Sequence, residues 1–437
     1  MKPIRTIILG AAGRDFHNFN TFFRNNDKFR VVAFTAAQIP NIDNKRYPNS
    51  LTGEHYGQGI PIYSESLLPE LVKSLKVDLC ALSYSDLPNQ KVMEIAAGVQ
   101  ALGTDFMLLG PNSTQLKSRK PIIAITAVRT GSGKSQITDY VAEFLTKINV
   151  KYVVVRHPMP YGNLEMQRVQ VYNDLEDLDR YEATIEEREE YEKHLVKGRT
   201  VIAGIEYSEI LKAAELRSEI ILWDGGNNDF PFFKPDLHIT IVDPLRENHE
   251  LLYYPGLTNL MTADIVVINK ENTATKEQIR NAIENIKIMN PKAKIVHTES
   301  IIQLNKKIKA RAKAIIVEDG PTTTHGGMTY GAGYLAAKKA KLKIIDPRPY
   351  AVGSIKKTLQ KYPNVKEIVP AMGYFPKQLM ELKQTIEHSH ADIAIIGTPI
   401  DLSELLHLNI PSARAEYFIK EKGTALKKEI LKFSRKI

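Results

Sequence analysis

The feature that most constrains this chain is a glycine-rich segment between a predicted buried strand and a predicted helix. Residues 122–127 form an apolar, β-branched run, which is typical of a strand buried on both faces. Residues 136–145 place apolar side chains at helical spacing. Between them, Gly131 and Gly133 let backbone N–H groups turn inward, where the helix N-terminus adds positive potential. Strand, glycine turn and helix in this order predict a phosphate-binding loop in an α/β fold.

The side chains of this loop match those that a bound nucleoside triphosphate needs. Lys134 is placed to reach the β and γ phosphates, and the Ser135 hydroxyl is placed to bind Mg²⁺. The commonest form of the motif has glycine at the position of Val128, whereas the form K-G-G-x-G-K-[ST] fits with Arg129 in first place. That form resembles the P-loop of the SIMIBI class of NTPases, in which the first basic residue often reaches a nucleotide across a dimer interface. We expect Arg129 to act in this way or within its own site.

Two further strand ends predict groups that complete a nucleotide site. An apolar strand ends in Asp224, where a carboxylate can orient water on Mg²⁺. Another predicted strand ends before Asn269 and Lys270, which resemble the base-recognition motif N-K-x-D of GTPases, except that Asn272 replaces its aspartate. Asparagine presents an NH₂ group to the base as well as a carbonyl, which weakens selection of guanine. We therefore expect ATP with Mg²⁺ as the cofactor, and GTP is the alternative.

Polar residues at other strand ends are candidate contacts for a substrate. Arg14 follows a glycine turn at residues 10–13, which departs from a dinucleotide fingerprint at its later glycine positions. Arg156 and His157 open a proline-rich loop, and His325 lies in a loop rich in glycine and threonine. Either loop is alternatively a plain connector. Open α/β sheets bind ligands at the carboxyl ends of their strands, so these positions favour an anionic substrate site.

The length of the chain and its strand pattern predict three α/β regions. Residues 1–118 indicate a Rossmann-like doubly wound domain, which ends at a basic, proline-terminated linker. Residues 119–310 hold the P-loop NTPase domain. Residues 311–437 form a C-terminal α/β region, which we expect to pack with the P-loop domain.

The composition of the chain indicates in which compartment it works and which kinds of partner it can have. No run of the 437 residues is long and apolar enough to span a bilayer, and we expect a cytoplasmic protein with no membrane partner. The single cysteine, Cys80, excludes an internal disulfide. The net charge of +9 is spread along the chain rather than gathered in a basic tail. We therefore expect no nucleic-acid partner, and a small, phosphorylated anionic substrate explains the charge equally well.

Taken together, these motifs resemble the family of cyclic 2,3-diphosphoglycerate synthetases, whose members are also described as predicted GTPases. The resemblance runs from the first strand to at least Asp401 and is carried by residues 10–17, 127–135, 155–162, 223–231, 318–321 and 324–327. It implies ATP-driven closure of 2,3-diphosphoglycerate into an internal phosphoanhydride, with release of ADP and phosphate. It also implies that a substrate oxygen attacks the γ-phosphate while Lys134, Arg129 and Asp224 neutralise the developing charge with Mg²⁺.

A second class of function stays open, because relatives in the SIMIBI class include regulatory or metal-delivery GTPases that drive a partner protein. The class also favours a homodimer. The predicted site comprises the catalytic residues Lys134, Arg129 and Asp224; the nucleotide-binding residues Thr130, Gly131, Ser132, Gly133, Lys134, Ser135, Gln136, Asn269 and Lys270; the substrate-binding residues Arg156, His157, His325 and Arg14; and the metal ligands Ser135 and Asp224.

Overall fold

The computed structural model describes residues 2–10, 13–36, 45–157, 163–226, 229–320, 329–371, 376–398 and 402–436. Its contacts divide the chain into two compact units. The first unit holds Met1–Asp177, Gly198–Thr298 and Glu421–Ile437, and the second holds Leu178–Lys197 and Glu299–Lys420. The predicted domain limits at 118 and 310 fall inside these units, so they stay predictions.

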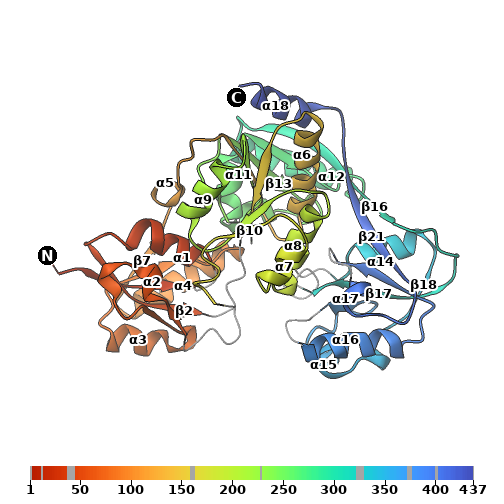
Figure 1. The fold of residues 1–437 in the computed structure, drawn as a ribbon, viewed down its shortest axis with the longest axis horizontal. Helices are drawn as coiled ribbons and strands as arrows, with labels where there is room; N and C mark the ends of the chain where they lie inside the picture. Colours follow the sequence, from red (N-terminus) through yellow and green to blue (C-terminus); the bar gives the residue numbers. More distant parts are fainter. Residues whose placement is uncertain are drawn as a thin grey trace. The chain divides into compact units, whose positions relative to one another are not determined.

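The first unit opens with a six-stranded sheet in the order β3-β4-β2-β1-β5-β7, in which only β3 is antiparallel (Figure 1). Helix α1 and the π-helical turn η1 pack their aromatic rings on one face, and helices α3 and α4 cover the other. Burial on both faces explains why these strands are apolar throughout. The elements are β1 (Ile4–Leu9), α1 (Arg14–Asn18), η1 (Phe19–Phe23), β2 (Phe29–Ala36), β3 (Arg46–Tyr47), α2 (Asn49–Thr52), β4 (Ile60–Ser64), α3 (Leu68–Ser74), β5 (Leu79–Leu82), α4 (Asn89–Ala101), β7 (Asp105–Leu108) and α5 (Pro111–Thr114).

A second sheet of the first unit runs in the order β10-β11-β9-β12-β8-β13-β15 and ends on the first half of β16, which continues into the second unit. Strand β10 is antiparallel to β11, and the other pairs are parallel. The predicted strand at 122–127 is confirmed as its central strand β8, buried at every position. The elements are β8 (Ile122–Ala127), α6 (Lys134–Lys147), β9 (Tyr152–Val155), β10 (Gln170–Tyr172), α7 (Glu176–Arg180), β11 (Val201–Ala203), α9 (Tyr207–Glu215), β12 (Ile220–Trp223), β13 (Leu237–Val242), α10 (His249–Leu252), α11 (Gly256–Thr262), β15 (Ile265–Ile268), α12 (Lys276–Met289) and β16 (Lys294–Leu304).

The parallel arrangement decides where the functional loops lie. Loops that follow β8, β9, β12, β13 and β15 all leave the same edge of the sheet, because parallel strands share one direction. The loop after β5 of the first sheet is tied to this region by a short antiparallel pair of strands, β6 (Leu87–Pro88) with β14 (Tyr253–Tyr254). Segments distant in sequence therefore converge around the end of β8.

The second unit is built on parallel strands around β17, which pairs with β18, β19 and β20, while β20 pairs with β21. Its core consists of aliphatic side chains from these strands and from α15 and α16. The elements are α8 (Ile185–Leu195), β17 (Lys313–Asp319), α14 (Ala332–Lys339), β18 (Lys343–Ile344), α15 (Gly353–Lys361), β19 (Val369–Ala371), α16 (Pro376–His388), β20 (Ile393–Gly397), α17 (Leu402–Leu405) and β21 (Ser412–Glu421).

The chain returns to the first unit at its end. Helix α18 (Ala425–Ser434) buries Leu426 and Ile430, and it contacts α6. Glu421 accepts a hydrogen bond from the Tyr140 hydroxyl of α6 at 2.9 Å. The predicted C-terminal region therefore contributes its last helix to the unit that holds the P-loop.

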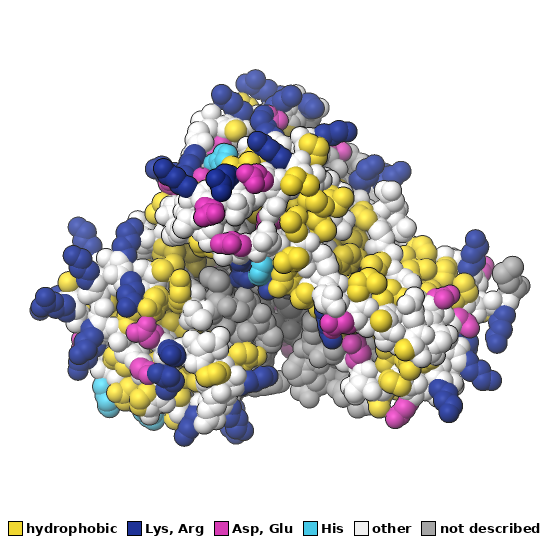
Figure 2. Space-filling view, turned by 180° about the vertical axis from the view of Figure 1, so that it is seen from behind, with side chains coloured by type: hydrophobic (Ala, Val, Ile, Leu, Met, Phe, Trp, Pro, Cys, Tyr) yellow, Lys and Arg dark blue, Asp and Glu magenta, His cyan; other side chains and the backbone are white. Residues whose placement is uncertain are grey.

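The surface agrees with the dispersed charge of the sequence. Figure 2 shows Lys and Arg side chains scattered over the visible face of the molecule. Among the described residues, no helix is both long and apolar enough to cross a membrane.

Candidate functional site

The loop between β8 and α6 has the backbone geometry of a phosphate cradle. Gly131 and Gly133 have φ values of +83° and +105°, a conformation that favours glycine. A Cβ atom on Gly133 would lie 2.2 Å from the side-chain nitrogen of Asn269, so a larger residue at position 133 would displace the Asn269 side chain. Helix α6 begins at Lys134, directly after this turn. The predicted strand, turn and helix are therefore all present.

A buried carboxylate gathers the charged residues of the site. Asp224, which follows β12, has no exposed surface, and the Lys134 Nζ lies 2.7 Å from its Oδ1. Thr138 donates a hydrogen bond to the same oxygen at 2.8 Å, and Arg156 pairs with Oδ2. Two cations around one carboxylate leave a positive charge beside the glycine turn, which favours an arriving phosphate.

Thr138 was missed by the sequence reasoning, although a signal for it exists. It lies four residues after Lys134 on α6, and residues at that spacing share one face of a helix. A hydroxyl on the same face as the P-loop lysine is therefore placed to reach the same carboxylate. Ser135 and Gln136 also lie in the first turn of α6, where both are half-buried.

Asn269 and Lys270 support the P-loop from the end of β15. Asn269 donates a hydrogen bond from its amide to the Ser132 carbonyl at 3.1 Å. Lys270 donates to the Gly131 carbonyl at 2.6 Å and pairs with Asp243 at the same distance. Both side chains hold the loop in shape, and their predicted contact with a base stays a prediction. Asp243 was not singled out, although it directly follows strand β13.

Arg129 is held within its own chain. Its guanidinium lies 3.0 Å from an oxygen of Asp86 and stacks 3.9 Å above the centre of the Tyr253 ring. Thr130 donates a hydrogen bond to the other oxygen of Asp86 at 2.7 Å. Asp86 belongs to the loop after β5, so the first sheet anchors the start of the P-loop. The homodimer, in which Arg129 would reach a partner's nucleotide, stays a prediction.

The turn after β1 brings Arg14 and His157 to the same region. A Cβ atom on Gly13 would lie 1.8 Å from the His157 ring, so the glycine lets this ring approach. Arg14 pairs with Asp229 at 3.3 Å and donates a hydrogen bond to the Tyr254 hydroxyl at 3.0 Å. Burial raises the pKa of Asp229 to about 7, although the nearby Arg14 acts in the opposite direction.

The structure thus brings most of the predicted residues together. The residues predicted to bind the nucleotide surround the end of β8, and Arg156, His157 and Arg14 lie on neighbouring strand ends. His325 lies outside the described residues. In the part of the chain that is described, no cluster of three or more His, Cys, Asp and Glu side chains is arranged to hold a metal ion.

Comparison with known proteins places this site in a family. No family model matches the sequence. The chain is 52% identical to the arginine synthetase ArcE of Thermococcus kodakarensis over 432 residues, which covers 98% of this chain and 96% of that protein. It is 24% identical to a cyclic 2,3-diphosphoglycerate synthetase of Thermococcus sibiricus over 289 residues, covering 59% of this chain and 65% of that one.

One solved structure, LpxK from Aquifex aeolicus in complex with ATP, covers 84% of this chain and 97% of its own, with a TM-score of 0.40 and 14% identity. The sequence relatives are named synthetases, and the P-loop geometry of this chain agrees with a nucleotide-dependent ligase. The predicted relation to cyclic 2,3-diphosphoglycerate synthetases is confirmed at the level of this broader group. The chain belongs to the family of the arginine synthetase ArcE, which is related to the cyclic 2,3-diphosphoglycerate synthetases.

Proposed function

We propose that this chain is an ATP-dependent ligase that forms arginine from citrulline and ammonia. Its 52% identity to an arginine synthetase across 98% of its length is the observation that carries the proposal. Citrulline is the acceptor that fits chemically, because replacing the oxygen of its ureido group by ammonia gives the guanidinium group of arginine. That oxygen is a poor leaving group, and transfer of a phosphoryl group from ATP activates it.

The nucleotide is proposed to lie along the turn at residues 130–136. The triphosphate would accept hydrogen bonds from the backbone N–H groups of this turn and from the start of α6. Lys134 pairs with Asp224 at 2.7 Å, and its long side chain would exchange this carboxylate for the β and γ phosphates. Arg156 would keep Asp224 paired during the exchange.

The oxygen atoms of Ser135 and Asp224 are proposed to hold Mg²⁺. Two protein oxygens suit this ion, which usually completes its shell with phosphate oxygens and water. The fit requires Lys134 to leave Asp224, because its Nζ now lies 2.7 Å from Oδ1. Mg²⁺, when bound, neutralises charge on the transferring phosphoryl group.

The chemistry follows in two balanced steps. The ureido oxygen attacks the γ-phosphorus, the bond from that phosphorus to the bridging oxygen breaks, and ADP leaves. Ammonia then attacks the activated ureido carbon and gives one proton to the phosphate, which leaves as hydrogen phosphate with the former ureido oxygen. Lys134 and Arg156 stabilise the charge that develops on the phosphoryl oxygens, and holding both reactants in place makes each step effectively intramolecular.

The acceptor is proposed to bind where the first sheet meets the P-loop. The parallel strands β4-β2-β1-β5-β7 have the order of a Rossmann-like doubly wound sheet. Along the chain, strands are first added on one side of β1 and then, from β5, on its other side, so the topological switch point lies between β1 and β5. Ligands of such sheets bind in the crevice at that point. Arg14 follows β1, and its partner Asp229 provides the opposite charge, so the pair suits the carboxylate and ammonium groups of an amino acid.

Two other functions remain candidates for specific reasons. Relatives named cyclic 2,3-diphosphoglycerate synthetases match part of the chain, and the buried arginines Arg14 and Arg156 suit phosphate groups. A regulatory GTPase is the other candidate, because Asn269 and Lys270 resemble the start of the base-recognition motif of GTPases. A dependence of turnover on 2,3-diphosphoglycerate, or a preference for GTP together with stimulation by a protein partner, would favour one of these.

The test is an assay of the purified full chain with ATP, Mg²⁺, citrulline and ammonium, each omitted in turn. Arginine and ADP are both measured, and 2,3-diphosphoglycerate and GTP are tried in parallel. We expect arginine and ADP in equal amounts only in the complete mixture. ADP release that ignores citrulline and responds to 2,3-diphosphoglycerate would replace the proposal by the second candidate.

A further inference from the structure

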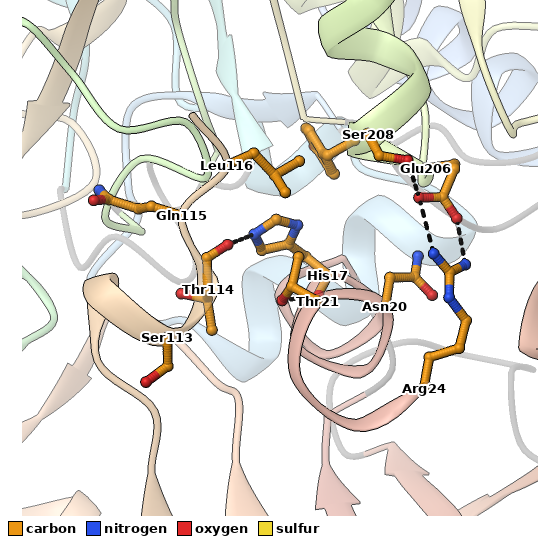
Figure 3. Close-up of a pocket in the computed structure, with 11 residues that line it drawn as sticks. His17, Asn20, Thr21, Arg24, Ser113, Thr114, Gln115, Leu116, Glu206 and Ser208 are labelled. Carbon is orange, nitrogen blue, oxygen red and sulfur yellow. Dashed lines mark hydrogen bonds and ion pairs between the residues drawn. The ribbon is translucent and has the colours of Figure 1, made fainter. Parts of the chain in front are cut away.

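Charged pairs join the two sheets of the first unit at separate places. Arg24, directly after η1, pairs with Glu206, directly before α9, at 2.6 Å, and Figure 3 shows this pair beside a cavity of about 230 Å³. A second pair joins Asp86, in the loop after β5, to Arg129, in the loop after β8. Of these two pairs, only the second ends on the phosphate loop.

Asp86 directs both oxygens of its carboxylate to the start of the phosphate loop. One oxygen lies 3.0 Å from the Arg129 guanidinium, and the other accepts a hydrogen bond from the Thr130 hydroxyl at 2.7 Å. Arg129 also donates to the backbone carbonyl of Asp86 at 3.3 Å. The two paired side chains are only 18% and 10% exposed, so solvent screens their charges weakly. Asp86 therefore offsets the positive charge that Arg129 would otherwise offer to a phosphate.

The backbone of Asp86 is suited to a contact that is made and broken. Its φ of +59° is a left-handed conformation, which costs energy in a residue other than glycine. Such conformations persist where their surroundings hold them, and they cluster at functional sites. Here the surroundings are the contacts to Arg129 and Thr130 and the pairing of β6 with β14, which begins at the next residue, Leu87. Loss of one of these contacts would let the loop relax.

A second arginine lies against the same phosphate loop. A Cβ atom on Gly131 would lie 3.0 Å from the Nη2 of Arg246, whose side chain is buried. Asp86 pairs with one of the two arginines, and Asp243 pairs with the other. If Asp86 turned away, the net charge beside the loop would rise by one, which favours a triphosphate and the transition state of its transfer.

The loop after β5 also reaches the proposed acceptor site. Ser85, which directly precedes Asp86, forms a side-chain hydrogen bond with Asp229, the partner of Arg14. A ligand shifts an equilibrium only if it interacts differently with the two states. An acceptor whose ammonium group pairs with Asp229 would compete with Ser85 for that carboxylate, so it would favour the state in which the loop has moved.

We propose that Asp86 keeps Arg129 paired, and so keeps its charge from the γ-phosphate, until the acceptor is bound, an inference that rests on the proposed function. Without an acceptor, water can attack the γ-phosphorus. The bond from that phosphorus to the bridging oxygen then breaks, and ADP, phosphate and a proton are released without any arginine. While Arg129 is paired with Asp86, this transition state lacks one stabilising charge. Asp86 is thus a positioning residue that acts through Arg129.

The test measures ADP and arginine released by full-length variants, with and without citrulline. Asp86→Asn removes the charge, and asparagine tolerates the left-handed backbone at this position. Glu206→Gln makes the same chemical change in the other pair that joins the sheets, so it reports any loosening between them. A third protein carries Arg129→Gln in addition to Asp86→Asn.

We expect Asp86→Asn to release ADP in the absence of citrulline about ten-fold faster than the wild type, the effect of one charge-assisted hydrogen bond. In the complete mixture, this variant should therefore make more ADP than arginine. Glu206→Gln should make the two products in equal amounts, as the wild type does. The added Arg129→Gln should abolish the extra release of ADP, because the freed charge is then absent.

Each other result counts against the proposal. Equal amounts of ADP and arginine from Asp86→Asn, in protein with wild-type melting temperature, would overturn the role of Asp86 and leave arginine synthesis standing. An equal excess of ADP from Glu206→Gln would also overturn it, because that result indicates a loosened contact between the sheets. So would an excess that persists after Arg129→Gln. A wild-type protein that makes no arginine would end the proposed function, and the role of Asp86 with it.

Discussion

The Lys134 ammonium pairs with the buried carboxylate of Asp224, and its proposed function requires it to exchange that partner for a phosphate. Asp224 keeps two other contacts, from Thr138 and Arg156, so it stays partnered when Lys134 moves. Removing one member of a buried ion pair is otherwise strongly destabilising, by about 3–5 kcal/mol. The extra contacts of Asp224 therefore reduce the cost of releasing Lys134.

Replacing this lysine should abolish turnover while leaving the fold intact. We expect Lys134→Ala to lower kcat by about a hundred-fold or more, because one preorganised charge on the transferring group is lost. The matched control is Lys147→Ala, at the exposed end of the same helix. Release of ADP measured for both variants checks this. An active Lys134→Ala enzyme would show that the nucleotide binds elsewhere.

The sequence predicted which residues belong to the candidate site, but it did not predict which of them contact one another. Lys134, Asp224 and Arg156 could be named because each follows a recognisable strand or turn. Their partners could not, because the pairing of Arg129 with Asp86 depends on how a loop of the first sheet meets the P-loop. Such a contact between distant segments leaves no local pattern in the sequence.

At the scale of elements, the glycine turn determines whether α6 can present its N-terminus. We expect Gly133→Ala to weaken nucleotide binding by about ten-fold or more, because its φ of +105° is strained for alanine and its Cβ would displace Asn269. Gly98→Ala is the matched control, since it lies in α4 with open space around it. That control should be neutral or stabilising by up to about 1 kcal/mol. Equal binding by both variants, measured by calorimetry, would argue against the cradle.

Strand β13 makes stability depend on pH. Burial lowers the pKa of His238 to about 4, so the folded chain binds fewer protons than the unfolded chain between pH 4 and the ordinary histidine value. The contribution of His238 to the free energy of unfolding is therefore fully present above about pH 6.5. It is lost as the pH falls below this value, by up to about 1.4 kcal/mol per pH unit. Denaturant unfolding at several pH values gives the free energy of unfolding as a function of pH. Below about pH 6.5, this free energy should depend less steeply on pH in His238→Gln than in the wild type. Identical slopes would contradict a neutral buried His238.

Most elements of the fold could be predicted from the sequence, whereas their grouping could not. The strands at β8, β12 and β13 were predictable because parallel strands buried on both faces are continuously apolar. The return of the chain through β21 to α18 was not, because its partner α6 lies far away in sequence. When a compact unit is assembled from separate segments of the chain, the amino-acid composition does not change at its limits, so the sequence gives no sign of them.

For the whole molecule, nucleotide should stabilise the first unit selectively. A ligand at a hundred times its Kd adds about 2.7 kcal/mol, which raises the melting temperature of a unit as large as the first by about 4 °C. The P-loop belongs to the first unit, so its unfolding step should move with a Mg²⁺-bound ATP analogue. Scanning calorimetry with and without the analogue tests this, and Lys134→Ala should not respond. A shift confined to the second unit would place the nucleotide elsewhere.

The most direct measurement follows one oxygen atom through the reaction. The full chain is supplied with ATP, ammonium and citrulline that carries heavy oxygen in its ureido group, and the released phosphate is analysed by mass spectrometry. If the ureido oxygen attacks the phosphoryl group held by Lys134, the label must appear in phosphate in step with arginine. Phosphate without label, released while arginine forms, would contradict activation by phosphoryl transfer at this site.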